Sequence, residues 1–453
     1  MSDVLRVLAI CHEDIDWILG GMGQHVRELY RWMCYRGDVV VDLINTGAGN
    51  GSQLYTSFHR HLPDAAPMPW KPHSEGMSSV LTQDIRGLRT LLRLVLEGKR
   101  WDVVAGHEWG ALQLAWAARD LLGIPLVGTM HLSNTHLTLG SPNDDSQDAL
   151  LRKIEATADL SEEDLLSLRS TFGAAAYPGT ELSTYAMNQE ARLVCESDET
   201  ILCSRAYVNL ARDLYHLDFL GKSVNMIYNG IDLEAWNPRA GDAQRARSTH
   251  HLPEDKPIAL FVGRIAEMKG IVHLLSAAEA GLLDDWCVVL AGAVNAVTEA
   301  DKENWSVTKQ IRKLVKAKPA MFRWLDYQYG QSIKDLYAAA TVVVMPSTHE
   351  PFGLVALEAM AMGVPLVSTE VDGLGEIVVD DFGGEYAMII PAGSPNAIGE
   401  ALCILKDPAK RSTLRALGLQ RVKDFSWEVA ATQTVGVYRK AVERAGQHRQ
   451  LKG

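Results

Sequence analysis

Two glutamates frame a Pro-Phe-Gly corner in the stretch "HEPFGLVALEAMAMG", residues 349–363. Glu350 stands directly before the corner, and Glu358 stands eight residues later in an apolar, helix-forming run that Gly363 ends. This spacing gives the two carboxylates separate functions. Glu358 could reach the ribose hydroxyls of a nucleoside, and Glu350 could hold a sugar. The alternative for Glu358 is that it only complements the helix dipole.

The Pro-Phe-Gly corner also predicts a phosphate site. Gly353 has no side chain at the point where the helix would begin. The backbone N–H groups of Leu354 and Val355 would then be free to point at a phosphate, aided by the positive end of the helix dipole.

Two cations follow a predicted strand in "FVGRIAEMKG", residues 261–270. Arg264 comes at the end of the strand and Lys269 stands five residues later. Two fixed positive charges there are costly unless an anion meets them. A diphosphate suits both, because Arg offers a planar fork and Lys a compact point charge. The alternative is two cations on a surface loop.

The first predicted strand is followed by "HEDIDWILGGMGQHV", in which Gly20 and Gly21 stand just before a helix. Glycines there would let the backbone approach a ligand at the helix N-terminus. The spacing is not the G-x-G-x-x-G pattern of a nicotinamide site. Asp14 and Asp16 imitate a metal-binding D-x-D, but so short a match is expected by chance.

Two further strands end in "GHEWG" and "TMHLSNTH". His131 is a candidate functional residue because it stands at the carboxyl end of its strand, where ligands of parallel sheets bind. His107 and Glu108 stand at the end of the other strand, and Glu108 is a candidate for the acceptor side. The alternative for each histidine is a structural residue with satisfied hydrogen bonds.

The elements that must position these residues are short apolar strands alternating with helices. Strands apolar on both faces indicate parallel sheets covered on both sides. The stretch 237–256 is polar and poor in large apolar residues, which indicates a domain boundary. The fold class predicted is α/β, with two doubly wound Rossmann-like domains and a ligand site in the cleft between their strand ends.

The composition of the 453 residues excludes some classes. The net charge is −12, from 44 basic and 56 acidic residues, so a general nucleic-acid binder is not expected. The six cysteines stand singly without a C-x-x-C pair, which favours free thiols in a reducing cytoplasm. We expect no targeting leader, because the N-terminal residues do not form a charged stretch followed by an apolar one. We expect no transmembrane segment, because no run reaches roughly 18–20 apolar residues. No oligomeric state is indicated.

Two segments leave their role open. Residues 141–173 form an acidic, helical insertion that could be a lid, an acceptor-binding element or surface padding. Residues 85–100 form an amphipathic helix with basic residues. It could touch a membrane surface or, as we expect, pack its leucine stripe on a sheet.

Taken in order, these stretches resemble the retaining GT-B glycosyltransferases. Glycogen and starch synthases and related sucrose- and trehalose-type transferases are the nearest in pattern. The likeness spans Gly20 to about Val378, and its most specific part is the E-x₇-E pattern of the opening stretch. The matching stretches are "GGMGQHVREL", "AGHEWG", "TMHLSN", "YNGIDLEAWNP", "FVGRIAEMKG" and "EPFGLVALEAMAMGVPLVSTEVDGLGEIV".

The resemblance implies a domain plan. Residues 1–238 would be the N-terminal, acceptor-side domain, and residues 239–425 the C-terminal domain that binds the nucleotide-sugar donor. Residues 426–453 look like the family's closing helix, which returns to the first domain.

The resemblance also implies roles. Arg264 and Lys269 would bind the donor diphosphate, Glu350 the donor sugar, and Glu358 the ribose. In the first domain, Gly21 would bring the backbone to the diphosphate. His131 would contact the sugar and support positive charge at its anomeric carbon.

The reaction implied is transfer of a hexose, with glucose the first expectation, from a UDP or ADP sugar to a hydroxyl acceptor. Configuration would be retained without a metal or other cofactor. The match departs at Ile18, where glycogen synthases usually carry Lys, and at Glu108, where they carry Asp. These departures extend the candidate acceptors from a glucan to small sugars and polyols. The alternatives are a nucleotide-sugar 2-epimerase and a non-catalytic sugar-nucleotide-binding protein.

Overall fold

The computed structural model divides the chain into two compact units, each described by itself below. The predictions for Asp14, Asp16, Ile18, Gly20 and residues 141–173 lie outside the described residues. The structure describes residues 4–13, 15, 21–46, 57–61, 75–132, 181–215, 217, 224–294 and 306–452.

The first unit comprises Met1–Tyr228 and Trp427–Gly453. Its parallel sheet has the strand order β3-β2-β1-β4-β5-β6-β7. The strands are β1 (Leu5–Cys11), β2 (Val39–Asn45), β3 (Phe58–His61), β4 (Val103–His107), β5 (Leu126–Met130), β6 (Glu199–Leu202) and β7 (Val224–Met226).

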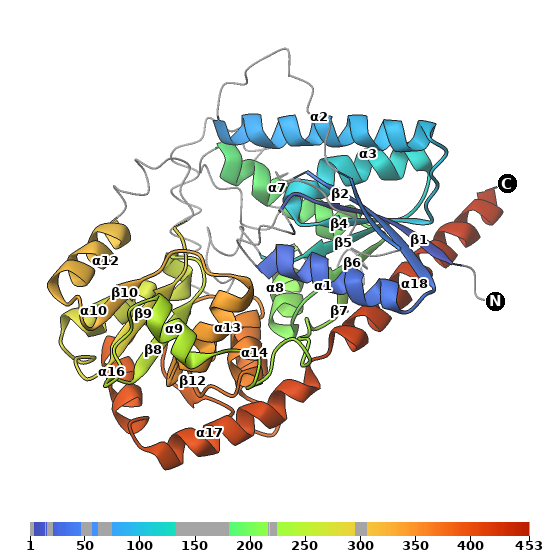
Figure 1. Cartoon of the computed structure of the whole chain (residues 1–453). Coiled ribbons are helices and arrows are strands. Elements are labelled where there is room, and N and C mark those ends of the chain that lie inside the picture. Colours follow the sequence, from blue (N-terminus) through green and yellow to red (C-terminus); the bar gives the residue numbers. More distant parts are fainter. Residues whose placement is uncertain are drawn as a thin grey trace. The chain divides into compact units, whose positions relative to one another are not determined.

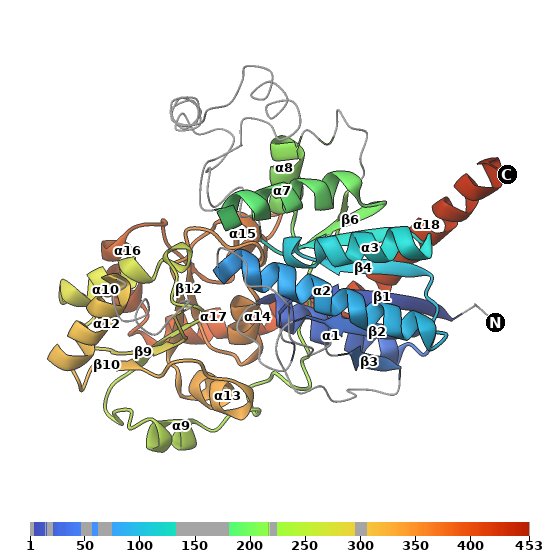
Figure 2. The ribbon, with the colours of Figure 1, turned by 90° about the horizontal axis from the view of Figure 1, so that it is seen from above.

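Helices cover both faces of this sheet (Figure 1). Helices α2, α3 and α7 lie on one face, and α1 packs with α18 on the other. Seen from above, α2 and α3 run side by side (Figure 2). The helices are α1 (Gly21–Tyr35), α2 (Glu75–Leu96), η1 (Trp109–Ala111), α3 (Leu112–Leu122), α7 (Glu181–Glu196), α8 (Arg205–Tyr215) and α18 (Trp427–Lys452).

The second unit comprises Asn229–Ser426. Its parallel sheet has the order β10-β9-β8-β11-β12-β13, which repeats the pattern of the first six strands of the other sheet. The strands are β8 (Ile258–Val262), β9 (Cys287–Ala291), β10 (Phe322–Trp324), β11 (Val342–Met345), β12 (Leu366–Ser368) and β13 (Met388–Ile389).

Helices of the second unit pack in groups around this sheet. Helix α10 contacts α12 and α16, while α13 contacts α9 and α14 contacts α17. The helices are α9 (Ala243–Thr249), η2 (Glu267–Lys269), α10 (Ile271–Glu279), α12 (Ser306–Ala317), α13 (Gly330–Ala339), α14 (Leu354–Ala361), α15 (Asp372–Val378), α16 (Pro395–Ile404), α17 (Pro408–Arg421) and η3 (Val422–Asp424).

The amino-acid sequence explains these elements locally. The central strands are apolar and buried along almost their whole length, as sheets covered on both faces require. Helix α16 begins where the Ser394 hydroxyl accepts a hydrogen bond from the Ala397 N–H and Pro395 takes a first-turn position. Two parallel-sheet α/β units with this strand order confirm the predicted fold class.

Three details differ from the sequence analysis. Residues 229–238 were assigned to the first domain but belong to the second unit, where the Ile231 N–H donates to the Phe425 carbonyl. The stretch 237–256, where the domain boundary was predicted, contains α9, which packs on α13. Strand β3 was not expected, because "FHRH" lacks an apolar run.

The amphipathic stretch 85–100 lies largely within α2, which begins earlier, at Glu75. Leu91 and Leu94 are buried in the core of the first unit, so the leucine stripe packs inward as expected. Among the described residues, none of the helices is both long and apolar enough to cross a membrane.

Candidate active site

The two predicted cations and Glu350 lie at one edge of the second sheet. Strands β8 and β11 pair in parallel, so the loops that follow them leave the sheet side by side. The N–H groups of Thr348 and His349 both donate to the Met268 carbonyl, at 2.9 and 3.2 Å. These bonds join the loop that carries Lys269 to the loop that carries Glu350.

A glycine makes this close approach possible. Gly270 has a φ of 66°, and a Cβ placed on it would lie 1.7 Å from the Pro346 carbonyl oxygen. No other residue type fits there without moving one of the two loops.

Lys269 and Glu350 form an ion pair at this edge. The Lys269 Nζ lies 2.6 Å from the Glu350 Oε2, and the two side chains are only 19% and 9% exposed. Each charge is therefore compensated by the other. The Glu350 N–H donates to the Asp372 Oδ2 at 2.9 Å, which fixes the corner from a third segment. Asp372 has a φ of 44°, an uncommon value that Asp tolerates better than most residues.

Arg264 follows β8 at the same edge and is half-buried. Its guanidinium makes no ion pair or hydrogen bond with any residue that the structure describes. The edge therefore carries one compensated cation and one uncompensated cation. A partly buried, uncompensated guanidinium favours an anionic ligand.

Helix α14 begins at Leu354, after Gly353 with a φ of 110°. This confirms the predicted helix start. Leu354 and Val355 are half-buried in the first turn of the helix, where backbone N–H groups have no intrahelical acceptor. A Cβ on Gly353 would lie 2.9 Å from the Leu374 Cδ1 and 3.6 Å from the Glu350 Cγ.

Glu358 lies on α14 and is 6% exposed. Its Oε2 accepts a hydrogen bond from the Tyr337 hydroxyl at 2.8 Å. Burial raises the pKa of Tyr337, so the hydroxyl stays protonated and remains a donor. The Trp236 ring packs edge-on against Tyr337 at 5.8 Å. The carboxylate of Glu358 is therefore held by a neighbouring helix.

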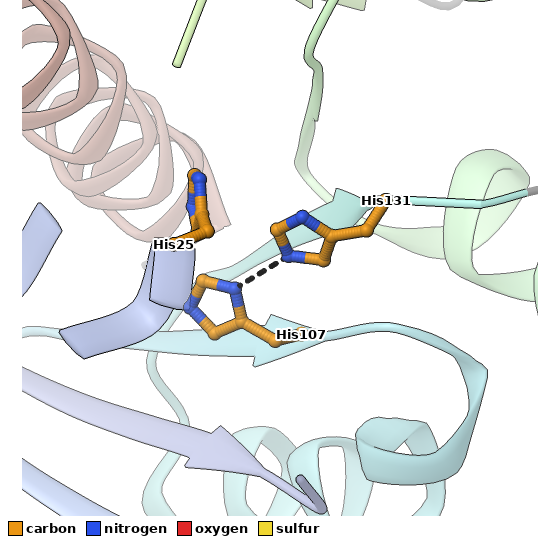
Figure 3. A group of neighbouring side chains, drawn as sticks. All are labelled: His25, His107 and His131. Carbon is orange, nitrogen blue, oxygen red and sulfur yellow. Dashed lines mark hydrogen bonds between the residues drawn. The ribbon is translucent and has the colours of Figure 1, made fainter. Parts of the chain in front are cut away.

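The first unit brings three histidines together (Figure 3). His25 comes from α1, His107 ends β4 and His131 follows β5. His107 Nδ1 and His131 Nε2 form a hydrogen bond of 3.2 Å, and the His25 ring packs edge-on to His131 at 4.4 Å. Burial lowers the pKa of His107 and of His131, so both imidazoles are neutral at pH 7.

Glu108 positions the loop that carries His131. Its Oε2 accepts a hydrogen bond from the His131 N–H at 2.7 Å, and its Oε1 one from the Leu132 N–H at 3.3 Å. Glu108 is buried with a φ of 66°, and burial raises the pKa of its carboxyl group. Both carboxyl oxygens are occupied by backbone donors, and the acceptor contact predicted for Glu108 stays a prediction.

Helix α1 begins at Gly21, which supports the expectation of a helix N-terminus at this point. The Gly23 N–H in its first turn donates to the Glu13 Oε2 at 2.9 Å. A carboxylate of this protein therefore takes one of the donors that were predicted to approach the diphosphate. The diphosphate contact of Gly21 stays a prediction.

Two family matches cover most of the chain. Residues 242–418 match the family Glycosyl transferases group 1, and residues 20–219 match the Glycosyl transferase 4-like domain. The solved structure of sucrose-phosphate synthase from Thermosynechococcus elongatus has the same fold. Its TM-score is 0.70 at 23% identity, over 96% of this chain and 98% of that chain. The chain belongs to the GT-B glycosyltransferase superfamily.

Curated relatives of this GT-B chain share its sequence to different extents. An alpha-maltose-1-phosphate synthase of Mycobacterium tuberculosis is 36% identical over 224 residues, 48% of this chain and 57% of that protein. The match thus spans little more than half the length of that relative. A D-inositol 3-phosphate glycosyltransferase of Kribbella flavida is 28% identical over 447 residues, 94% of this chain and 91% of that protein.

Several residues of this GT-B chain escaped the sequence analysis because their signal is in the packing. Asp372 and Tyr337 are ordinary in sequence and become relevant only through their bonds to Glu350 and Glu358. Glu13 and His25 stand inside quoted motifs, but nothing in the spacing indicated their partners.

The three histidines are also the described residues best placed to bind a metal ion in this GT-B chain. One ring nitrogen from each lies within 4.8 Å of the others. Neutral imidazoles bind zinc with N–Zn distances of about 2.0–2.1 Å. The expectation that no metal is needed stays a prediction.

Proposed function

We propose that this protein is a retaining glycosyltransferase that moves a hexose from a nucleoside diphosphate sugar to a hydroxyl acceptor. Glucose is the first candidate for the hexose. The observation that carries the proposal is the uncompensated Arg264 beside the Lys269–Glu350 ion pair, at the edge shared by β8 and β11. Membership of the GT-B superfamily supports the same reaction class.

The donor diphosphate would bind the two cations. Arg264 can hold two phosphate oxygens with its planar fork. Lys269 would turn from Glu350 to the phosphate, and this exchange would release the Glu350 carboxylate. Glu350 is then free to accept hydrogen bonds from hydroxyls of the donor sugar. One ion pair is thereby replaced by two interactions with the substrate.

The rest of the nucleotide would lie along α14. The first-turn N–H groups of Leu354 and Val355 would donate to a phosphate. Glu358 would accept hydrogen bonds from the ribose hydroxyls with the oxygen that Tyr337 does not occupy. The hydrogen bond from Tyr337 fixes the direction of the carboxylate before the donor arrives.

The chemical step would break the bond between the anomeric carbon and the diphosphate oxygen. Negative charge grows on that oxygen, and Arg264 and Lys269 stabilise it. The anomeric carbon becomes oxocarbenium-like. The acceptor oxygen bonds to this carbon on the same face, and its proton passes to the departing phosphate. Configuration is retained, and the leaving group needs no separate general acid.

His131 would contact the donor sugar as a neutral imidazole. A charged imidazolium would oppose the positive charge that develops at the anomeric carbon, whereas a neutral ring does not. The low pKa of His131 therefore suits this role.

The acceptor proposed first is a phosphorylated small sugar or polyol. The names of both curated relatives include a phosphorylated carbohydrate or polyol, and the structural neighbour is a sucrose-phosphate synthase. A glucan and an unphosphorylated sugar are the next classes. We also propose a cytoplasmic location, because all six cysteines are free.

A donor panel tests the proposal. Purified protein is incubated with UDP-, ADP- and GDP-sugars, with and without each acceptor class, and released nucleotide and product are measured. We expect release that depends on the acceptor and a product with retained configuration. Turnover of the donor alone to an epimer would indicate a 2-epimerase. Donor binding without turnover under any combination would indicate a non-catalytic binding protein.

A further inference from the structure

A chain of four hydrogen-bonded side chains leads from the C-terminal helix to His131. The Tyr438 hydroxyl on α18 lies 3.2 Å from the Tyr30 hydroxyl on α1. The Tyr30 hydroxyl lies 2.6 Å from the His107 Nε2, and the His107 Nδ1 lies 3.2 Å from the His131 Nε2. Tyr30, Tyr438 and His107 are fully buried. We call these four side chains the relay.

Each member of the relay is neutral. Burial raises the pKa of Tyr30 and of Tyr438, so both hydroxyls keep their protons. Burial lowers the pKa of His107, so this ring carries a single proton on one of its two nitrogens. The proton on His107 therefore sets the direction of the relay. On Nδ1 it is donated to His131, and on Nε2 it is donated to Tyr30.

The two directions differ in what they leave unsatisfied. If Tyr30 donates to His107 Nε2, then His107 Nδ1–H donates to His131 Nε2, and Tyr438 donates to Tyr30. The hydrogen left over is then the Nδ1–H of His131, a residue that is only half-buried, so water can accept it. In the reverse direction Tyr30 donates to Tyr438, and the Tyr438 hydrogen has no acceptor among the described residues. A buried, unsatisfied hydroxyl hydrogen is costly, which favours the first direction.

We propose that Tyr30, acting through His107, fixes His131 in the tautomer that carries its proton on Nδ1. His131 then presents an N–H donor from Nδ1, and its Nε2 is occupied as an acceptor within the relay. Tyr30 and His107 are positioning residues, and Tyr438 is a supporting residue from the far end of the chain. The consequence for sugar transfer rests on the proposed function, whereas the tautomer itself does not.

This assignment gives the donor sugar a defined partner. A sugar hydroxyl beside the Nδ1 of His131 would act as acceptor for that N–H. The backbone N–H of His131 donates to Glu108, and the ring is held at its Nε2 by His107. Both the backbone and the side chain of His131 are therefore fixed. The wrong tautomer would point a lone pair at the sugar and require the hydroxyl to turn.

The first experiment measures the tautomer directly. The full chain is labelled with ¹⁵N-histidine, and the ring nitrogens of His131 are assigned by comparison with His131→Asn. We expect Nδ1 protonated and Nε2 unprotonated, with the Nδ1–H tautomer in about tenfold excess or more, the scale set by one unsatisfied buried hydroxyl. A wild-type His131 protonated mainly on Nε2 would overturn the inference.

Substitutions separate the members of the relay. Tyr30→Phe removes the hydroxyl that sets the direction, so both tautomers of His131 should become populated. Tyr438→Phe should keep the Nδ1–H tautomer, because Tyr30 still has His107 as its acceptor. Tyr207→Phe is the matched control, since Tyr207 is a fully buried tyrosine of the same unit outside the relay. An unchanged tautomer in Tyr30→Phe would contradict the proposal.

Sugar transfer gives an independent readout. Tyr30→Phe should lower kcat by about two- to tenfold at an unchanged donor KM, whereas Tyr207→Phe should retain the wild-type kcat. A tautomer shift without a change in kcat would overturn the link between the relay and the sugar. Absence of transfer by the wild type would contradict the proposed function and leave the measured tautomer as the test of the relay.

Discussion

The two units differ in the charge of their candidate site residues. In the second unit, Lys269 pairs with Glu350 and Arg264 has no ionic partner among the residues described. In the first unit, His107 and His131 are neutral rings joined to each other and to a tyrosine. One site consists of charged groups, and the other consists of neutral rings in a hydrogen-bonded network.

This difference matches two kinds of ligand. A diphosphate brings negative charge, and Arg and Lys side chains bind it through charge-assisted hydrogen bonds. A sugar ring brings neutral hydroxyls, and preorganised dipoles recognise it without reorganisation. Under the proposed function, the second unit would bind the nucleotide part of the donor and a sugar hydroxyl at Glu350, and His131 of the first unit would contact the same sugar. The predictions below test this assignment from the largest effect to the smallest.

Arg264→Ala should have the largest effect on transfer. It removes the cation that meets the leaving phosphate, and loss of one such donor typically lowers the rate by about 10²–10³-fold. Steady-state kinetics with the best donor would measure it. Arg239→Ala is the matched control, because Arg239 is an exposed arginine of the same unit. Equal, small losses for both variants would remove Arg264 from the site.

Lys269 and Glu350 should be coupled differently with and without donor. In the free protein, either single substitution leaves the other charge poorly compensated. The losses of unfolding free energy in Lys269→Met and Glu350→Gln should therefore add up to more than the loss in the double variant. With donor bound, each residue has its own substrate partner and the coupling should fall. Denaturant unfolding measures the coupling without donor, and donor affinity measures how it changes with donor, in the wild type, the two single variants and the double variant. Coupling that is unchanged by donor would contradict the partner exchange.

Gly353→Ala should strain the corner before α14. The backbone φ is 110°, and the added Cβ would lie 2.9 Å from Leu374. We expect a loss of about 1–3 kcal/mol in unfolding free energy, with weaker donor binding. Gly383→Ala separates the two causes, because Gly383 has a φ of 79° with nothing within 4 Å of its Cβ position. A smaller loss of unfolding free energy in Gly353→Ala than in Gly383→Ala would contradict the close contact between position 353 and Leu374.

The pH dependence of stability should report the neutral rings of the first unit. Burial lowers the pKa of His12 from 6.5 to about 4, and the pKa values of His107 and His131 are lowered in the same direction. The unfolded chain therefore binds more protons below pH 6.5. The contribution of these neutral rings to the free energy of unfolding is fully present above pH 6.5. It is lost as the pH falls from 6.5 towards 4.

Urea unfolding between pH 7 and pH 4 would measure this loss. His12→Asn should lower the stability at pH 7 and flatten the fall below it. The same fall in the variant as in the wild type would show that His12 carries none of the dependence.

Metal removal should have the smallest effect. The proposed mechanism uses no metal, so dialysis against EDTA should leave kcat unchanged, and metal analysis should find no stoichiometric zinc. One zinc ion per chain that is lost in His25→Ala would instead make the three histidines a metal site.

The sequence predicted the elements and the strand-end positions better than the contacts. Apolar runs and glycine corners are local signals, and they predicted the parallel sheets and the start of α14 after Gly353. Tyr30 and Tyr438 meet although 408 residues separate them. No local pattern encodes such a pair, because it depends on how α18 packs against α1.

The same reason explains the other gaps. Residues 229–238 look like a continuation of the first domain until Ile231 is seen bonded to Phe425. The Lys269–Glu350 pair needs Gly270 to pass close to Pro346, a constraint that a single glycine in the sequence does not reveal. Spacing indicated which residues could do chemistry, and packing determined which partners hold them.

A crystal structure with a bound nucleoside diphosphate tests the central assignment most directly. The account predicts phosphate oxygens within hydrogen-bond distance of the Arg264 guanidinium and the Lys269 Nζ, ribose hydroxyls on Glu358, and a broken Lys269–Glu350 pair. A well-ordered nucleotide bound away from Arg264, with the Lys269–Glu350 pair intact, would contradict it.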